Sequence, residues 1–320
     1  MKKIGSEKPD YEVMLSCPPM LLSIERYESF LVDKSIRIHC PDFTAVIPED
    51  ELIQCVGQYD GWIIGDDPAT ERVFAAGSNG KLRAAVKWGA GVDNVDFEGA
   101  KKVDIPISNT PGMFSDEVAD MAAGYVICLA RKIIDVHEGV KNGGWPKPVG
   151  MSLRGKHAAV VGFGYIGKEI TNRLLAFGME VTVYDPFVKP EHGLPSGVEV
   201  AAWPAKIEKA DFLVLACSLT KDNFHLLNDE LFGLCKKGLH IVNVARGQLI
   251  DESALYQAMK SGIVSGIALD VAEIEPLQPD NPLRNFESCI FGSHNGSNTQ
   301  EAVDRTSKMA IDLIHGFLTR

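Results

Sequence analysis

The chain has 320 residues, a length that predicts about two domains. Its composition, 45% hydrophobic and 23% charged residues, is that of a globular protein with a sizeable core. The formal net charge of −11 opposes binding to nucleic acid phosphates and to anionic lipid, and no run rich in Lys and Arg offsets it. Nucleic acids and membrane surfaces are therefore not expected as main partners.

The sequence also predicts a soluble, cytoplasmic protein. The two lysines near the start are not followed by an apolar stretch, so a secretory signal is not expected. The longest apolar run, Met121 to Ala130, is about half of the ~20 residues that span a bilayer. The seven cysteines are scattered and contain no Cys-x-x-Cys pair, which is typical of buried thiols in a reducing compartment. No disulfide and no metal site is expected.

Short apolar runs alternate with longer helix-like segments along the whole chain, a pattern typical of α/β proteins with parallel sheets. In the first third of the chain, strands are expected at Glu12–Ser16, Ile36–His39, Gly61–Ile64, Ala84–Lys87 and Ile105–Ser108. Further strands are expected at His157–Gly162, Glu180–Tyr184, Phe212–Ala216, His240–Val244, Ser265–Leu269 and Cys289–Gly292.

Two long amphipathic helices frame the second group of strands. One is expected from Ser115 to the turn before Gly143, with acidic residues in its first turn. The other is expected from Thr299 to Leu318 and would be capped by Asn298. The segment after His294 is too short for a domain, so this last helix is expected to pack against the first third of the chain. The predicted outer domain is therefore discontinuous, residues 1–108 and 295–320, and residues 109–294 are inserted in it.

The glycine turn, Gly162-Phe163-Gly164-Tyr165-Ile166-Gly167, is a candidate dinucleotide site. A lone Gly-x-Gly-x-x-Gly is a weak signal, but this one follows a buried strand and opens a helix. The N–H groups and dipole of that helix N-terminus attract a pyrophosphate. The next strand ends at Asp185, whose carboxylate would bind the ribose hydroxyls and repel a 2′-phosphate. The predicted cofactor is NAD, and Lys189 is the one nearby residue that favours NADP.

Polar side chains follow three of the later strands. Arg246 follows the strand at 240–244, Asp270 and Glu275 follow the strand at 265–269, and His294 follows the last strand. Ligands of doubly wound sheets bind at the carboxyl edge, where these strands end. We therefore expect an arginine, a carboxylate and an imidazole to converge there. The other seven histidines lack such a context and are interpreted as structural or solvated.

These segments, together with the glycine turn, resemble the D-isomer-specific 2-hydroxyacid dehydrogenases, and most of all their phosphoglycerate dehydrogenase and glyoxylate/hydroxypyruvate reductase branches. The similarity extends upstream to Lys87–Asp96, Asn109–Gly112 and Val118–Arg131, and it covers the chain from about residue 60 onward. The resemblance implies two Rossmann-like doubly wound parallel-sheet domains, with an NAD domain inserted into a flavodoxin-like substrate domain. It also implies a homodimer that transfers a hydride between NAD(H) and a small D-2-hydroxy acid or 2-keto acid.

The resemblance implies catalytic roles that agree with the chemistry of the side chains. Arg246 would grip the substrate carboxylate and polarise the carbonyl, because a guanidinium stays charged and offers a planar fork of donors. His294 would donate the proton in reduction and accept it in oxidation. Glu275 would hydrogen-bond the imidazole and raise its pKa.

Binding roles are implied for further residues. The substrate carboxylate would meet backbone N–H groups of Ala90 and Gly91, and Lys87 would lie near the substrate. Asp270 would contact the nicotinamide carboxamide. The remaining residues expected to contact the cofactor are Gly162, Gly164, Tyr165, Ile166, Gly167, Asp185, Cys217, Val244 and Ala245.

The sequence departs from the family pattern at two places. Many members have a proline where Ser218 stands, and the serine should relax the loop near the adenine. Members that bind phosphoglycerate carry basic residues around the loop aligned with Gly65-Asp66-Asp67, which is acidic here and would repel a phosphate. Glyoxylate or hydroxypyruvate is therefore the expected substrate type. Two alternatives remain, D-3-phosphoglycerate as the substrate and an NAD-sensing binding protein of the corepressor kind.

Overall fold

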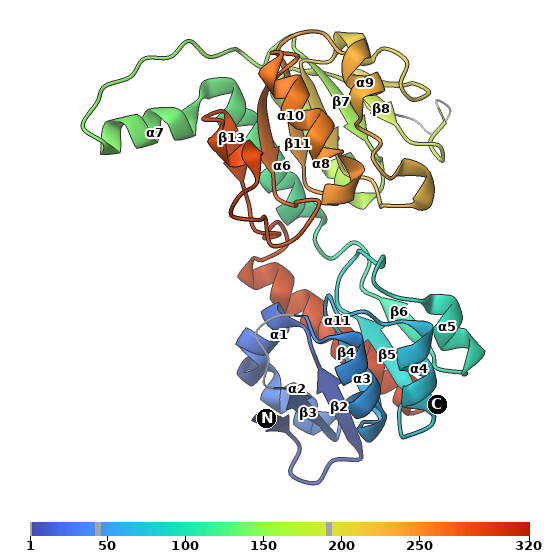
Figure 1. The fold of residues 1–320 in the computed structure, drawn as a ribbon. Helices are drawn as coiled ribbons and strands as arrows, with labels where there is room; N and C mark the ends of the chain where they lie inside the picture. Colours follow the sequence, from blue (N-terminus) through green and yellow to red (C-terminus); the bar gives the residue numbers. More distant parts are fainter. Residues whose placement is uncertain (1, 42–45, 190–193) are drawn as a thin grey trace. The chain divides into compact units, whose positions relative to one another are not determined.

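The computed structural model describes residues 2–41, 46–189 and 194–320. It divides into two compact units, one formed by Met1–Phe114 with Asn298–Arg320 and the other by Ser115–Ser297 (Figure 1). The first change of unit falls at 114/115 and not at 108/109. The reason is that the strand Ile107–Asn109 pairs with Ala84–Lys87 in the first sheet and keeps the residues around it in the first unit.

The first unit is built on a six-stranded sheet in the order β1-β3-β2-β4-β5-β6. Its strands are β1 (Lys2–Gly5), β2 (Tyr11–Leu15), β3 (Ile36–Cys40), β4 (Gly61–Ile64), β5 (Ala84–Lys87) and β6 (Ile107–Asn109). All neighbours are parallel except β1 and β3. Without the antiparallel β1, the order is that of a flavodoxin-like sheet. The helices of this unit are α1 (Pro18–Ser23), α2 (Glu28–Asp33), α3 (Glu49–Cys55), α4 (Glu71–Ser78), α5 (Phe97–Lys102) and α11 (Gln300–Leu318).

Helix α11 belongs to the first unit although it comes from the end of the chain. It packs against β4 and β5, and Trp88 Nε1 donates to Ser307 Oγ at 3.2 Å. Its N-cap is Thr299, whose hydroxyl accepts from the Ala302 N–H at 3.1 Å, so the prediction of Asn298 as the cap is wrong by one residue. The hydroxyl of Thr299 lies three residues before that N–H, which is the spacing a capping side chain needs.

The second unit contains a seven-stranded, fully parallel sheet in the order β13-β12-β11-β10-β7-β8-β9. Its strands are β7 (His157–Val161), β8 (Glu180–Tyr184), β9 (Val198–Val200), β10 (Phe212–Leu215), β11 (Leu239–Asn243), β12 (Val264–Leu269) and β13 (Cys289–Phe291). From β9 to β12 this is the Rossmann order, whose switch point lies between β7 and β10. The helices are α6 (Ser115–Arg131), α7 (Ile133–Lys141), α8 (Tyr165–Ala176), α9 (Asp229–Leu234) and α10 (Glu252–Lys260). The predicted fold class is confirmed.

The local predictions differ from the structure in two ways. Every predicted strand is present within two residues of its expected ends, but β1 and β9 were missed because these short edge strands carry no apolar run. The helix predicted from Ser115 to Gly143 is two helices. Lys132 adopts a left-handed conformation (φ 51°) between them, and neither Gly nor Pro marks the break in the sequence.

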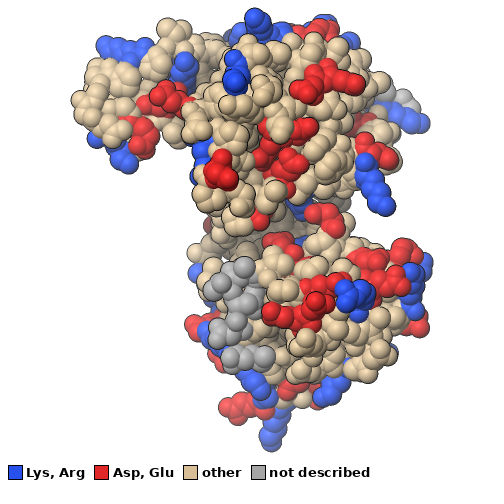
Figure 2. Space-filling view, viewed as in Figure 1, with Lys and Arg blue, Asp and Glu red and all other residues tan. Residues whose placement is uncertain are grey.

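The composition of the surface agrees with the net charge. On the face drawn in Figure 2, Lys and Arg side chains of the described residues are scattered among acidic ones and form no continuous patch. None of the helices in the described part of the chain combines the length and apolar character that crossing a membrane requires. All seven cysteines are free thiols, of which Cys17 and Cys40 are buried and the others partly exposed.

Candidate active site

The glycine turn lies at the carboxyl end of β7, at the switch point of the second sheet. Gly162 has a left-handed backbone (φ +94°), and a Cβ there would lie 2.6 Å from the backbone nitrogen of Cys217. A Cβ on Gly167 would lie 2.0 Å from the carbonyl oxygen of Gly162. Gly164, the N-cap of α8, would meet nothing within 4 Å. Two glycines are thus required by packing within the protein, whereas the third leaves open space in front of a helix N-terminus.

Asp185 follows β8 and is tied to the glycine turn. Its Oδ2 accepts from the N–H of Phe163 at 2.8 Å, and its Oδ1 accepts from the N–H of Phe187 at 2.8 Å. The carboxylate is therefore fixed in orientation, and each oxygen keeps a further lone pair for a hydroxyl donor. An open helix N-terminus beside an oriented carboxylate fits the pyrophosphate and ribose of NAD.

The loop after β10 contains Cys217, which is half-buried. Burial raises the pKa of its thiol to about 11, so it is an uncharged wall of the turn at neutral pH. The proline expected after it is replaced by Ser218, but the loop is closed by other means. Asn223 Nδ2 donates to the Ser218 carbonyl at 2.8 Å, and Asn223 Oδ1 accepts from the Thr220 N–H at 2.7 Å.

Arg246 follows β11 in a tight loop held by Asn243. The fully buried Asn243 side chain accepts from the Ala245 N–H at 3.0 Å and donates to the Arg246 carbonyl at 2.8 Å. The Arg246 Nη1 donates to the Ala245 carbonyl at 2.8 Å. Val244 and Ala245 are buried at the start of this loop. The loop therefore presents a half-buried guanidinium at the carboxyl edge of the sheet, where the glycine turn also lies.

Glu275 and His294 form a hydrogen-bonded pair after β12 and β13. His294 Nδ1 lies 2.9 Å from Glu275 Oε2, and Glu275 Oε1 accepts from the Ala272 N–H at 3.2 Å. A carboxylate beside Nδ1 orients the ring and stabilises its protonated form. Both side chains are 40% exposed, so each is open to a ligand. The sequence prediction that these two residues meet is matched by this geometry.

Asp270 is buried at the end of β12 and holds the loop that bears His294. Its carboxylate accepts from the N–H groups of Asn295 at 3.1 Å and Gly296 at 2.9 Å, and its carbonyl accepts from the His294 N–H at 2.6 Å. His294 has a left-handed backbone (φ 56°), which is uncommon for a non-glycine residue and is maintained by these bonds. Burial and the nearby Asp270 carboxylate raise the pKa of Tyr125 to about 12.

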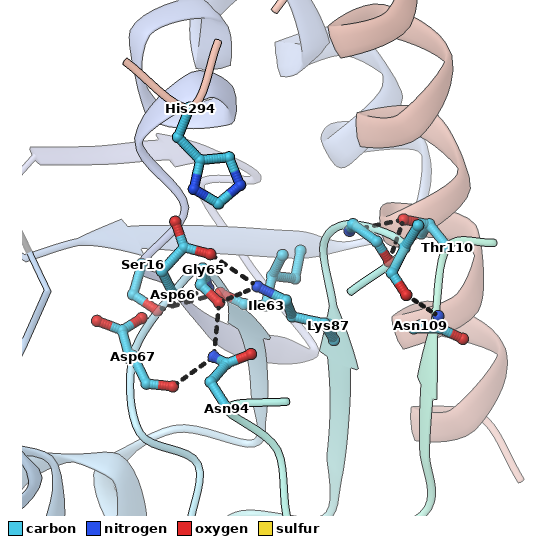
Figure 3. A network of polar contacts seen from close by, with 12 residues as sticks. Ser16, Ile63, Gly65, Asp66, Asp67, Lys87, Asn94, Asn109, Thr110 and His294 are labelled. Atoms are coloured by element: carbon cyan, nitrogen blue, oxygen red, sulfur yellow. Dashed lines mark hydrogen bonds and ion pairs between the residues drawn. The ribbon is translucent and has the colours of Figure 1, made fainter. Parts of the chain in front are cut away.

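A separate set of polar groups lies within the first unit, at the carboxyl ends of β4 and β5 (Figure 3). Lys87 is the last residue of β5 and is only 4% exposed. Its Nζ donates to the Gly65 carbonyl and lies 3.1 Å from Asp66 Oδ1. Asn94 Nδ2 donates to the carbonyls of Gly65 at 3.1 Å and Asp67 at 2.6 Å. The loop that the sequence identified as acidic therefore neutralises the lysine beside it.

Asp67 is the buried member of this loop. Its Oδ1 accepts from the Ile47 N–H at 2.8 Å, but no partner is found for its Oδ2 within the described part of the chain. Burial raises the pKa of this carboxyl. Sequence reasoning had no ground for separating Asp67 from Asp66, because both follow the same strand.

Ala90 and Gly91 lie in the turn after β5. Asn109 Nδ2 donates to the Ala90 carbonyl at 3.1 Å, and the Gly89 N–H donates to Thr110 Oγ1 at 2.8 Å. These bonds fix the turn from its carbonyl side. Among residues 2–41, 46–189 and 194–320, none accepts a hydrogen bond from the N–H of Ala90 or Gly91. The turn thus retains backbone donors for an anion.

Comparison with known proteins gives consistent results. The family model of the NAD binding domain of D-isomer specific 2-hydroxyacid dehydrogenases matches residues 123–296. The hydroxypyruvate reductase of Thermotoga maritima is 36% identical over 275 residues, which cover 84% of this chain and 88% of the relative. The D-3-phosphoglycerate dehydrogenase of Sus scrofa is 36% identical over 281 residues, which cover 84% of this chain and 51% of the relative.

Solved structures show the same similarity over both units. The TT0316 protein from Thermus thermophilus has a TM-score of 0.83 and 27% identity and covers 96% of this chain and 97% of its own. The apo D-lactate dehydrogenase of Escherichia coli has a TM-score of 0.80 and 26% identity, with 94% and 95% covered. This chain spans about half the length of the phosphoglycerate dehydrogenases that it matches. From its sequence, its fold and these similarities, the chain belongs to the D-isomer specific 2-hydroxyacid dehydrogenases and contains their NAD-binding domain.

Proposed function

We propose that the protein transfers a hydride between NAD(H) and a small D-2-hydroxy acid or 2-keto acid. The observation that carries this proposal is the hydrogen-bonded pair of His294 and Glu275, which follows strands of the same sheet as Arg246 and the glycine turn, at its carboxyl edge. A base with an orienting carboxylate at 2.9 Å and a cation on a neighbouring loop are the groups that reduction of a keto acid requires.

Each side chain has a chemical task in this proposal. The guanidinium of Arg246 binds the substrate carboxylate and polarises the carbonyl that is reduced. The imidazolium of His294 donates its Nε2 proton to the developing alkoxide, and Glu275 stabilises the charged ring. In the oxidation direction, neutral His294 removes the hydroxyl proton. NAD, held by the glycine turn and Asp185, supplies or accepts the hydride.

In this proposal the first unit is the substrate domain and the second unit is the NAD domain. The N–H groups of Ala90 and Gly91, in the first unit, bind the substrate carboxylate. The substituent on the 2-carbon is small and carries no phosphate. The Lys87–Asp66 ion pair supports this limit, because a phosphate would have to displace the carboxylate that already neutralises Lys87. Relatives named glyoxylate reductase and hydroxypyruvate reductase agree with such a substrate.

A second candidate substrate is D-3-phosphoglycerate. Several similar relatives carry the name D-3-phosphoglycerate dehydrogenase, and Lys87 is a buried cation in a suitable loop. A corepressor-like sensor of NAD would keep the same residues but would show no turnover.

We also propose that the protein is a cytoplasmic homodimer. Helix α7 extends away from the rest of its unit in Figure 1 and buries none of its own residues. Its Ile133, Ile134 and Val140 are exposed, as are Trp145 and Val149 in the following segment. A second copy would cover this apolar surface. Light scattering tests the dimer. Trp145→Asp should shift the measured mass from that of a dimer to that of a monomer, and a monomeric wild type would refute the dimer.

A panel of keto acids with NADH tests the activity and the substrate together. Glyoxylate, hydroxypyruvate and phosphohydroxypyruvate should be compared by kcat/KM. We expect turnover of the first two and a strong preference against the phosphorylated acid. A preference for phosphohydroxypyruvate would instead support the phosphoglycerate alternative. If no acid turns over although NADH binds, the sensor alternative is favoured.

A further inference from the structure

The loops that bear Arg246 and Glu275 touch each other in the second unit. A Cβ on Gly247 would lie 1.9 Å from both the carbonyl carbon and the carbonyl oxygen of Ala272, so the two backbones are in direct contact. Gln248 strengthens this contact, because its Nε2 donates to the Glu273 carbonyl at 2.9 Å. Arg246 and Glu275 each lie two residues from one of the partners of this hydrogen bond.

His225 joins the two loops from a third segment. Its N–H donates to the Gln248 carbonyl at 2.9 Å, and its Nε2 lies 2.7 Å from Glu273 Oε1. His225 therefore contacts the Glu275 loop with its imidazole ring and the Arg246 loop with its backbone N–H. Its backbone is left-handed (φ 52°), and the exposed Phe224 stacks on the imidazole with ring centroids 4.0 Å apart.

The far side of Glu273 is anchored to helix α10. Glu273 Oε2 accepts from the Glu252 N–H at 3.3 Å, and Glu252 Oε1 accepts from the Glu273 N–H at 2.8 Å. The Nδ1 of His225 lies 3.7 Å from Asp251, the N-cap of the same helix. A rigid element thus supports both ends of the His225–Glu273 contact.

We propose that His225, Gln248 and Glu273 form a clamp, in which His225 and Glu273 are positioning residues that set Arg246 and Glu275 relative to each other. This inference rests on the proposed function, because there Arg246 binds the substrate and Glu275 supports the His294 that transfers the proton. None of the clamp residues is assigned a contact with the substrate or the cofactor. The clamp matters because a shift of about 1 Å in a catalytic group can lower the rate by about a hundredfold.

The test uses the full chain and compares two histidine variants. His225→Asn keeps a residue that tolerates the left-handed backbone but is too short for the Glu273 contact. The matched control is His157→Asn, because His157 is also partly buried and lies 2.8 Å from Thr182 Oγ1. His157 is the first residue of β7 and therefore lies at the amino ends of the strands, away from the carboxyl edge that bears the two loops. Glu273→Gln, which keeps one acceptor oxygen, is compared with Glu273→Ala.

Two measurements are made on each variant. The first is amide hydrogen exchange of residues 244–249 and 271–276, which does not depend on turnover. The second is kcat/KM with NADH and hydroxypyruvate, together with NADH affinity by fluorescence. For His225→Asn we expect faster exchange in both segments, kcat/KM lower by at least about tenfold and NADH affinity within about twofold of wild type. The control should change neither, and Glu273→Gln should lose less activity than Glu273→Ala.

Unchanged exchange in either segment of His225→Asn would overturn the clamp, and so would faster exchange with unchanged kcat/KM. An equal loss of activity in His157→Asn would reduce the effect to general destabilisation and would also overturn it. A wild type that turns over no acid would contradict the proposed function instead, while the exchange data would still decide whether His225 holds the two loops.

Discussion

The different surroundings of Gly164 and Gly167 lead to opposite expectations for one kind of substitution. In Gly167→Ala the new methyl would lie 2.0 Å from the Gly162 carbonyl oxygen, whereas ordinary contacts begin at 3.4 Å. The start of α8 must move by more than an ångström away from the turn. Overpacking against rigid backbone costs about 1–3 kcal/mol, and the depth of this clash places the cost near the upper end. Thermal unfolding should then begin roughly 5–10 °C lower than in the wild type.

Gly164→Ala should behave in the reverse way. Its Cβ meets no atom within 4 Å and its backbone (φ −70°) suits any residue, so stability should stay within about 0.5 kcal/mol of wild type. The methyl would stand where a pyrophosphate must approach the backbone. NADH affinity should fall at least about tenfold, or about 1.4 kcal/mol.

The assay is a thermal unfolding curve and an NADH fluorescence titration for each variant. Gly233→Ala is the control, because this exposed glycine in α9 also has nothing within 4 Å but lies outside the turn. It should keep both stability and NADH affinity. Normal NADH binding by Gly164→Ala would refute the assignment of the pyrophosphate to this turn. Unchanged stability of Gly167→Ala would refute the packing argument.

Further predictions concern the charged groups of the two units. Glu275→Gln replaces a charge-assisted hydrogen bond to His294 by a neutral one, so the reduction of hydroxypyruvate should slow about tenfold, and an unchanged kcat would contradict the role of this pair. Asp66→Asn leaves Lys87 without its carboxylate partner, and kcat/KM for phosphohydroxypyruvate relative to hydroxypyruvate should rise about tenfold; an unchanged ratio would contradict the role of the ion pair. Burial raises the pKa of Asp67, so the folded state binds a proton more tightly than the unfolded state and gains stability as pH falls. Asp67→Asn removes the buried charge, so its free energy of unfolding in urea should exceed that of the wild type at neutral pH. This difference should shrink as the pH is lowered, and a constant difference would contradict the burial of a charged Asp67.

The fold could be predicted from the sequence because its strongest signal, apolar strands that alternate with helical segments, repeats along the whole chain. Buried parallel strands such as Phe212–Leu215 read as continuous apolar runs, and their ends were located within two residues. The edge strand β1 has an exposed, lysine-bearing start and pairs only with β3, so its signal is weak. The break at Lys132 is a left-handed backbone at a residue type that usually favours helices, so the sequence gives no signal for it.

The candidate site was predictable where a motif names its residues. Arg246, Glu275 and His294 were expected at one sheet edge, with Glu275 hydrogen-bonded to the imidazole, and the structure gives this pair a distance of 2.9 Å. The support of these residues was not predictable. Nothing in the local sequence distinguishes His225 from the other histidines, because its partners come from loops far along the chain. The buried Asp270 likewise shows its hold on the His294 loop only in three dimensions.

The configuration of the product tests the central claim most directly. Hydroxypyruvate reduced with NADH yields glycerate, whose configuration chiral chromatography determines, and the same reaction is run with His294→Asn. We predict D-glycerate from the wild type and a rate lowered by at least about a hundredfold in the variant. Formation of L-glycerate, or an undiminished rate without the imidazole, would contradict the proposed function.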